Sequence, residues 1–144
     1  MRLHAMLRVA DLDASVAFYS ALFDHPPTTR KPDYAKWSLA EPSVNFSIAE
    51  RPAPHGIEHL GIEATTPDEL EALRERIGKA SEALPAAAVF DEGRTTCCYA
   101  NSDKTWITDA HGVSWEAFHT ASESPSYHGE PEVKAAGCCA PDCC

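Results

Sequence analysis

The feature of this sequence that most constrains its fold is an order of predicted elements that occurs twice. In the first half, alternating apolar residues predict a strand over residues 3–9, and Asp11 can cap a helix that follows it. Two further strands are expected over residues 34–40 and 44–49, before a proline-containing linker at residues 51–56.

The second half starts the same order again. A strand is expected over residues 56–62, and a helix begins at Thr66-Pro67, because Thr66 can cap it and proline fits the first helical position. Candidate strands then follow at residues 86–90, 96–100, 105–108 and 114–118. Aligning His4 with His59 matches the halves in element order, although few residues are identical. The sequence therefore predicts an α+β fold with an internal duplication.

The composition argues against several classes of partner. A formal net charge of −10 over 144 residues argues against binding to nucleic acid or to anionic membranes, both of which attract clustered Lys and Arg. No apolar run approaches the length of a bilayer span, and the N-terminus lacks a signal-peptide pattern. We therefore expect one domain in a cytoplasmic protein.

The six cysteines form three vicinal pairs, Cys97-Cys98, Cys138-Cys139 and Cys143-Cys144. Neighbouring cysteines make poor disulfide partners, and a reducing compartment favours free thiols that bind metals or metalloids. Consecutive side chains of a strand point to opposite faces, so Cys97 and Cys98 can converge on one atom only at a strand end or in a loop. The alternative is a pair of small apolar residues, one on each face of the sheet.

Two histidines and a carboxylate form a candidate metal site. His4 and His59 begin equivalent strands, and Glu116 lies on the last expected strand of the second half. Two histidines and one carboxylate are typical of Fe(II) centres that activate oxygen. The matching region of the first half, residues 44–47, has neither a carboxylate nor a histidine, which predicts an open site with three ligands. A single histidine is more often a surface residue or a hydrogen-bonded core residue than a metal ligand, and it is the equivalent placement of His4 and His59 in the two halves that favours the metal site.

The remaining histidines and the aromatic residues have weaker claims. His25, His55 and His111 fall in expected turns, and His119 could support Glu116 or simply be exposed. The large aromatic residues can wall a cavity for an aromatic ligand or be ordinary core, and they are Trp37, Phe46, Trp106, Trp115 and Phe118.

The composition changes after Thr120. Ser, Glu, Pro and Gly dominate residues 121–144, where apolar periodicity stops, so a flexible tail that includes His128 is expected. Four thiols near its end could wrap around a soft metal or metalloid, and they belong to Cys138, Cys139, Cys143 and Cys144. A disordered tail with incidental cysteines is the alternative.

Several segments resemble known families. The stretch from Leu7 to Ser15, followed by Phe18-Tyr19, resembles the opening of vicinal oxygen chelate proteins, the group of glyoxalase I, extradiol dioxygenases and bleomycin-resistance proteins. A closer resemblance is to the C–As lyases of organoarsenical detoxification, which are often grouped with cadmium-induced proteins. The segments that carry it are residues 30–37, 44–46, 58–62, 95–100 and 115–120, and the vicinal Cys97-Cys98 is the most specific marker.

The resemblance implies both a fold and an activity. It implies two tandem βαβββ modules, at about residues 1–50 and 56–120, whose curved mixed sheet cups a metal site. It also implies a non-haem Fe(II) dioxygenase that uses molecular oxygen to cleave the carbon–arsenic bond of trivalent organoarsenicals, such as methylarsenite and reduced aromatic arsenicals, and releases arsenite.

The resemblance also implies roles for individual residues. His4, His59 and Glu116 would be the iron ligands, and Cys97 and Cys98 would hold arsenic as thiolates. Separately from the resemblance, we expect the adjoining segment to be a loop that covers the site or lines its cavity, through Tyr99, Asn101, Lys104 and Trp106.

Two alternatives stay open at this point. One is a sequestration protein for arsenite or cadmium without turnover, and the other is a glyoxalase-type enzyme on the same fold. Because both modules lie in one chain, a complete site needs no partner subunit.

Overall fold

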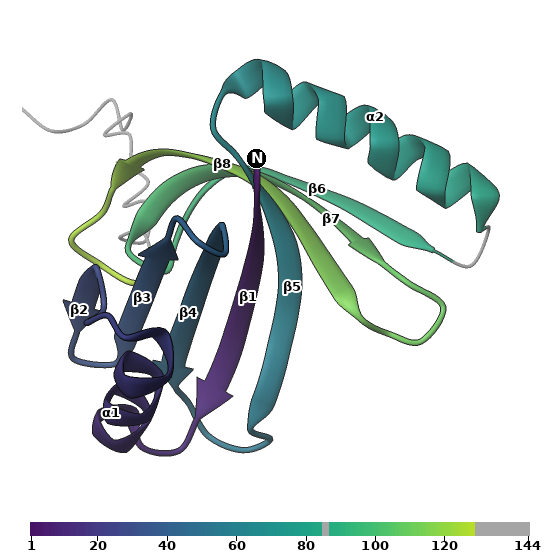
Figure 1. Ribbon diagram of the computed structural model, residues 1–144. Helices are drawn as coiled ribbons and strands as arrows, with labels where there is room; N and C mark the ends of the chain where they lie inside the picture. The colour runs from purple at the N-terminus through teal and green to yellow at the C-terminus, as the bar shows by residue number, and fades with distance from the viewer. Residues whose placement is uncertain (85–86, 129–144) are drawn as a thin grey trace, which may run out of the picture.

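The computed structural model describes residues 1–84 and 87–128, which form one curved sheet of eight strands with two helices (Figure 1). The strand order is β2-β3-β4-β1-β5-β8-β7-β6. The elements in chain order are β1 (Arg2–Val9), α1 (Leu12–Phe23), β2 (Thr29–Lys31), β3 (Tyr34–Leu39), β4 (Val44–Glu50), β5 (Gly56–Ala64), α2 (Pro67–Ala83), β6 (Ala88–Cys97), β7 (Ala100–Thr108) and β8 (Ser114–Glu123). Neither helix in the described part of the chain has the length and apolarity needed to span a membrane.

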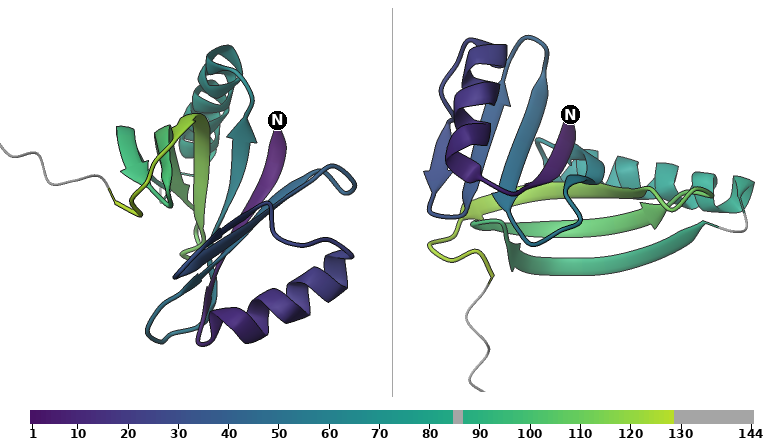
Figure 2. Two further views of the ribbon diagram at one scale, coloured as in Figure 1. Left: turned by 90° about the vertical axis from the view of Figure 1, so that its left-hand side faces the viewer. Right: turned by 90° about the horizontal axis from the view of Figure 1, so that it is seen from below.

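The predicted duplication is confirmed. Each half runs strand, helix and three strands, and in each half the first strand pairs in parallel with the last, β1 with β4 and β5 with β8. The antiparallel pair β1–β5 joins the halves at the centre of the sheet. Figure 2 shows how the sheet curls between the two modules, so the predicted α+β architecture of two tandem βαβββ modules is confirmed.

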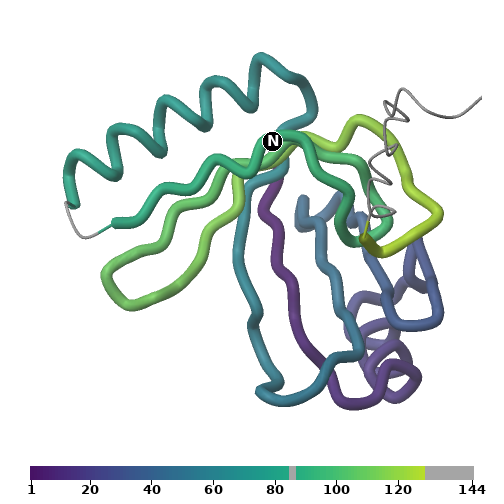
Figure 3. Tube along the Cα trace, turned by 180° about the vertical axis from the view of Figure 1, so that it is seen from behind, coloured from purple at the N-terminus to yellow at the C-terminus, as the bar shows by residue number. Residues whose placement is uncertain are grey.

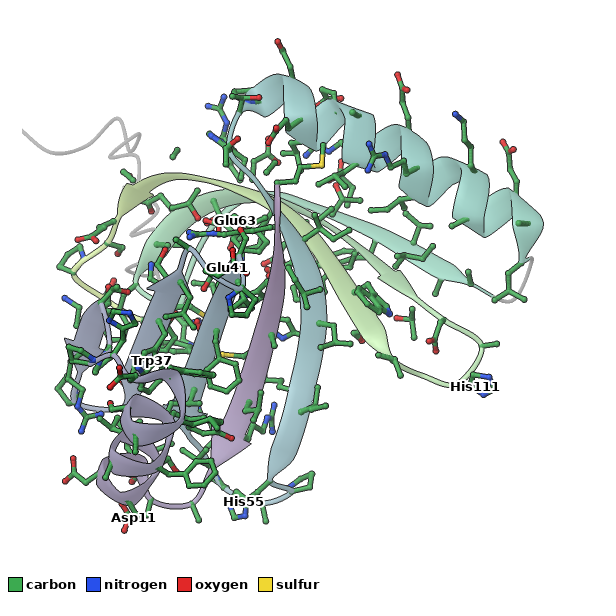
Figure 4. All side chains as sticks on the ribbon, in the orientation of Figure 1. Asp11, Trp37, Glu41, His55, Glu63 and His111 are labelled. Carbon is green, nitrogen blue, oxygen red and sulfur yellow. The ribbon has the colours of Figure 1, made fainter. Side chains whose placement is uncertain are left out.

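Each helix packs on its own module and leaves the inner face of the sheet free. The helix α1 starts at Asp11, whose carboxylate accepts a hydrogen bond from the backbone N–H of Ala14 at 2.9 Å. It covers a core that includes the fully buried Trp37 (Figure 4). The helix α2 buries Leu70 and Leu73 against β5 and β8.

The predicted strands differ from the observed ones at two places. The short strand β2 was not predicted, and the four candidate strands of the second half are three longer ones. In particular, residues 96–100 are not one strand, because β6 ends at Cys97 and β7 begins at Ala100. Cys98 and Tyr99 form the turn with φ values of 58° and 60°. Cysteine and tyrosine favour strands, so the local sequence predicts extended backbone at these two residues. The antiparallel pairing of β6 with β7 instead requires a turn there.

Replacing Trp37 by alanine is expected to lower the free energy of unfolding by about 3–5 kcal/mol, because it leaves a large cavity under α1. Its ring packs against the rings of Tyr19, Phe23 and Phe46, and its indole N–H donates to the carbonyl of His25 at 3.0 Å. Urea unfolding followed by circular dichroism measures this loss. The matched control is Phe18→Ala, since Phe18 is 62% exposed and its loss should change stability by less than about 0.5 kcal/mol. Equal effects of the two substitutions would contradict the assignment of the core.

Candidate functional site

Three metal-binding side chains meet on the inner face of the sheet, at the junction of the modules. His4 on β1, His59 on β5 and Glu116 on β8 each have a donor atom within 4.8 Å of the others. The Oε2 atom of Glu116 lies 3.8 Å from Nε2 of His4 and 3.5 Å from Nε2 of His59. All three residues are buried. Donors that share one ion at about 2.1 Å each can be at most about 4.2 Å apart, so both distances suit a single metal ion.

Two further contacts orient these donors. The ring atom Nδ1 of His4 lies 2.9 Å from the carbonyl oxygen of Asn45, a geometry in which Nδ1–H donates and Nε2 keeps its lone pair. The buried ammonium of Lys104 donates to Oε1 of Glu116 at 2.6 Å, which leaves Oε2 facing the histidines. The carboxylate can therefore bind a metal through one oxygen while Lys104 holds the other.

The electrostatics of the cluster keep His4 and Glu116 in metal-binding forms. Burial lowers the pKa of His4 to about 4, so its imidazole is neutral at physiological pH. Burial opposes ionisation of Glu116, but contact with His59 and the charge of Lys104 outweigh it and lower the pKa of Glu116 to about 2. A neutral imidazole and an ionised carboxylate are the forms that bind divalent metals.

Strand register explains why residues distant in sequence meet here. Gly61, two residues after His59 and therefore on the same face of β5, is the register partner of Glu116 on β8. In the first module the equivalent pair is Met6 with Ser47. The position that corresponds to Glu116 is thus a serine, whose hydroxyl lies 2.9 Å from the hydroxyl of Tyr34.

Replacing Gly61 by alanine is expected to weaken divalent-metal binding about tenfold or more. An added Cβ would lie 2.7 Å from the carbonyl oxygen of Glu116 and 3.2 Å from its Cβ, so β8 must move at the carboxylate. Titration with Co(II), followed by its visible absorption, measures the affinity. The matched control is Gly78→Ala in α2, where an added Cβ meets nothing within 4 Å. A Gly61→Ala protein with undiminished Co(II) affinity would contradict the role of this close approach.

The vicinal thiols converge at the turn that ends β6. The Sγ atoms of Cys97 and Cys98 are 3.2 Å apart, and both thiols are free. The backbone departs from the extended strand conformation at Cys98, where φ is 58°. The two thiols therefore converge at a strand end, as the sequence analysis requires. Contact with Cys98 lowers the pKa of Cys97 to about 7, whereas contact with Cys97 and burial raise the pKa of Cys98.

One cavity of about 310 Å³ joins the thiols to the metal-binding cluster. His4, His59 and Glu116 line it together with Cys97 and Cys98. Alternate residues of β7 line the same cavity, namely Ala100, Ser102, Lys104 and Trp106. The cavity can thus hold a small molecule that touches sulfur on one side and nitrogen and oxygen donors on the other.

The segment expected to be a covering loop is mostly strand. Asn101, Lys104 and Trp106 belong to β7, and only Tyr99 lies in the turn. Lys104 and Trp106 line the cavity, but the side chain of Asn101 bonds to Thr96 and Ser122 and does not line it. The expectation of a loop at these positions is therefore wrong, because pairing with β6 and β8 holds them in the sheet.

Most of the other sequence candidates lie away from the cluster, whereas Trp106 and Phe118 pack against its two histidines. His55 and His111 sit in the turns after β4 and β7 (Figure 4), and His25 follows α1. His119 lines a separate pocket beside Pro67 and Leu70, so it is not a partner of Glu116. Trp37 and Phe46 pack in the first module, Trp115 lies beside α2, and Trp106 and Phe118 line the cavity.

Several contacts around the cavity were not predicted. The carbonyl of Asn45 holds His4, and Lys104 contacts Glu116 rather than covering the site. Tyr127 and His128 line the cavity although the sequence placed them in a flexible tail. The two-residue spacing of Ser102, Lys104 and Trp106 was a readable sign that these side chains share one face. The four tail cysteines, Cys138, Cys139, Cys143 and Cys144, lie outside the described residues.

Comparison with solved structures shows the fold. The Mn(II)-bound glyoxalase from Novosphingobium aromaticivorans aligns with a TM-score of 0.59 and 16% identity, over 90% of this chain and 41% of that one. The methylmalonyl-CoA epimerase of Streptomyces coelicolor aligns with a TM-score of 0.54 and 17% identity, over 83% of this chain and 96% of that one.

Comparison with known sequences shows the family. The family model of the glyoxalase/bleomycin resistance protein/dioxygenase superfamily matches residues 2–117. A trivalent organoarsenical cleaving enzyme from Bacillus sp. (strain MD1) is 38% identical over 96% of this chain and 89% of that protein. The cadmium-induced protein CadI of Mycobacterium tuberculosis (strain ATCC 25618 / H37Rv) is 33% identical over 96% of this chain and 92% of that protein. The chain therefore belongs to the glyoxalase/bleomycin resistance protein/dioxygenase superfamily, in the branch that contains the trivalent organoarsenical cleaving enzymes and CadI.

Proposed function

We propose that this protein is an Fe(II)-dependent dioxygenase that cleaves the carbon–arsenic bond of trivalent organoarsenicals and releases arsenite. The observation that carries the proposal is the single cavity that contains both the thiol pair and the His4, His59 and Glu116 cluster. The names of relatives at 31–38% identity support the same substrate class.

The donor set fits Fe(II). Two histidines and one carboxylate on one side of a metal ion are typical of oxygenases with open coordination positions. Serine in the position that matches Glu116 supplies no fourth strong ligand from the first module. Bound Fe(II) would supply the activation of molecular oxygen.

The thiols fit trivalent arsenic, a soft centre that favours sulfur donors. Cys97 and Cys98 can each replace one hydroxyl on arsenic, with loss of one water for each As–S bond formed. Their attachment at the cavity wall would hold the carbon substituent in the space shared with His4, His59 and Glu116. Held this way, the substituent would lie beside His4, His59 and Glu116, the residues that would hold the metal, at high effective concentration.

The cavity walls suit either a methyl or an aryl substituent. Trp106, Phe118 and Met6 contribute apolar surface, and about 310 Å³ leaves room for an aromatic ring. Methylarsenite and reduced aromatic arsenicals are therefore the proposed substrates. Lys104 keeps Glu116 ionised and directed toward the histidines while the substrate binds.

The second candidate function is sequestration of arsenite or cadmium without turnover. The close Cys97–Cys98 pair favours it, because two thiols 3.2 Å apart can hold a soft ion with no help from iron. A glyoxalase-type reaction has less support, since Ser47 stands where a fourth metal ligand would be expected.

Anaerobic reconstitution with Fe(II), followed by addition of oxygen and methylarsenite, tests the proposal. Arsenite release, measured by chromatography with elemental detection, should require both Fe(II) and oxygen. The controls are metal-free protein in air and the Fe(II) protein without oxygen. Tight binding of methylarsenite with no arsenite release under any condition would favour sequestration and overturn the lyase assignment.

A further inference from the structure

A short segment after β8 folds back over the turn between β6 and β7. This turn, with Cys97 at the end of β6 and Cys98 and Tyr99 after it, is called the thiol turn. We call residues 124–128 the strap. Its backbone bonds to the β6–β7 hairpin at both ends, since the N–H of Ser124 donates to the carbonyl of Tyr99 at 2.7 Å and His128 forms a β-bridge with Cys97 at the end of β6. Figure 3 shows this part of the chain, in yellow-green, beside the end of the β6–β7 hairpin. The strap is thus attached to the segment that carries the thiols.

The strap places one tyrosine against one of the two thiols. The Cys98 thiol donates to the hydroxyl oxygen of Tyr127, with an Sγ–O distance of 3.4 Å. Tyr127 also packs against the rings of Tyr34 and Tyr99 and lines the cavity. The Tyr127 hydroxyl bonds to Cys98, whereas Cys97 contacts the strap through its β-bridge with His128.

The first module anchors this tyrosine. The guanidinium of Arg51 lies 4.1 Å from the centroid of the Tyr127 ring, a cation–π distance. Arg51 in turn pairs with Asp33 at 2.8 Å, and Asp33 accepts a hydrogen bond from the hydroxyl of Tyr99 at 2.6 Å. Tyr127 therefore contacts the thiol of Cys98, the guanidinium of Arg51 and the rings of Tyr34 and Tyr99. Together these contacts fix the orientation of its side chain.

We propose that Tyr127 is a positioning residue that prepares Cys98 to form the second As–S bond, an inference that rests on the proposed capture of trivalent arsenicals. A hydroxyl can accept a hydrogen bond from a thiol and, by rotating, donate one to the thiolate. The same contact therefore orients the Cys98 thiol before reaction and stabilises its sulfur as the proton leaves.

The two thiols then act in a defined order. Because the Cys98 thiol donates its proton to the hydroxyl of Tyr127, the Cys97 sulfur attacks arsenic first, forms one As–S bond and displaces one hydroxide. That hydroxide takes up the proton that the Cys97 thiol has lost and leaves as water. Cys98 next forms the second As–S bond, its thiol proton goes to the second departing hydroxide, and a second water leaves. Arsenic stays trivalent, so no oxidant or reductant is consumed.

Tyr127→Phe tests this role, because it keeps the ring over which Arg51 lies and removes only the hydroxyl. Iodoacetamide is the probe, and peptide mass spectrometry separates Cys97 and Cys98 from the tail cysteines. The alkylation rate of Cys98 at pH 7 should fall about tenfold, as its apparent pKa rises by about one unit on loss of a donor to the thiolate. The rate of Cys97 should change by less than about twofold.

The pH profile of Cys98 alkylation must be measured with its neighbours in place. The titratable and charged groups near Cys98 and Tyr127 come from several elements, and they are Tyr34, Arg51, Cys97, Tyr99, Lys104, Glu116 and His128. Tyr34→Phe is the matched control, since its hydroxyl bonds to Ser47 rather than to sulfur. It should leave the apparent pKa of Cys98 unchanged.

A second measurement separates this inference from the proposed function. Protection of Cys98 from iodoacetamide by methylarsenite should develop about tenfold more slowly in Tyr127→Phe than in the unaltered protein. If methylarsenite protects the unaltered protein but Tyr127→Phe reacts and is protected at the same rates, the role of Tyr127 is wrong while arsenical capture stands. If methylarsenite does not protect Cys97 and Cys98 in the unaltered protein, the proposed function fails, and the order of As–S bond formation fails with it.

Discussion

Replacing Glu116 by alanine is expected to lower Fe(II) affinity more than about 100-fold and to abolish arsenite release, while Cys97 and Cys98 still capture methylarsenite. The reason is that the two parts of the cavity have separate roles. The carboxylate of Glu116 faces His4 and His59, whereas the thiols lie at the end of β6. Loss of a direct ligand should exceed the roughly 10–100-fold cost of losing a supporting contact. Fe(II) binding is measured under anaerobic conditions by equilibrium dialysis, and capture is measured as protection of the two thiols from alkylation.

Glu116→Ala also leaves the buried ammonium of Lys104 without its partner, which can destabilise the fold. A second variant separates this effect from the loss of a metal ligand. Glu116→Gln keeps the size of the side chain and an oxygen that can accept from Lys104, so it should fold while still binding Fe(II) poorly. Glu82→Ala, which removes an exposed carboxylate of α2, is the control for charge. A folded Glu116→Gln protein with the Fe(II) affinity of the unaltered chain would contradict the assignment of this ligand.

Replacing Cys97 by serine is expected to produce the opposite result. Capture of methylarsenite at the turn should weaken at least about 100-fold, because one thiol cannot form the two-bond attachment that makes the second bond intramolecular. Arsenite release should be lost with it, whereas Fe(II) affinity should change by less than about twofold. Protection of Cys98 from alkylation and equilibrium dialysis of Fe(II) measure the two properties on the same protein.

The reciprocal pattern is what distinguishes a two-part site from a general loss of structure. Each variant should keep the property that the other loses, and so each serves as the folding control for the other. If both variants lost both properties while their circular dichroism matched that of the unaltered chain, the division of roles would be wrong. Retention of arsenite release by Cys97→Ser would show that the turn thiols are not needed to hold the substrate.

Much of the fold was predictable because its signals are local. The starts of both helices follow from short caps at Asp11 and Thr66, and the order of elements revealed two modules. The missed strand β2 has only three residues and owes its conformation to pairing with β3. The turn at Cys98 and Tyr99 was predicted as strand because both residue types favour extended backbone.

The candidate site was likewise predictable only in part. Its donor types could be read from the chain, since vicinal thiols suit soft ions, and two histidines with one carboxylate suit a transition metal. The contacts that orient these donors could not be read in the same way. The contact of Lys104 with Glu116 depends on the pairing of β7 with β8, and that of Tyr127 with Cys98 depends on the strap.

The sequence by itself determined the number of modules, the helix starts and the chemical nature of the candidate ligands, because each depends on neighbouring residues or on residue type. The tertiary structure decided which side chains share one cavity, since that depends on strand register between β1, β5 and β8, far apart in the chain. It also decided the protonation and orientation of those side chains. Burial and contacts with distant residues set these properties, and no local pattern encodes them.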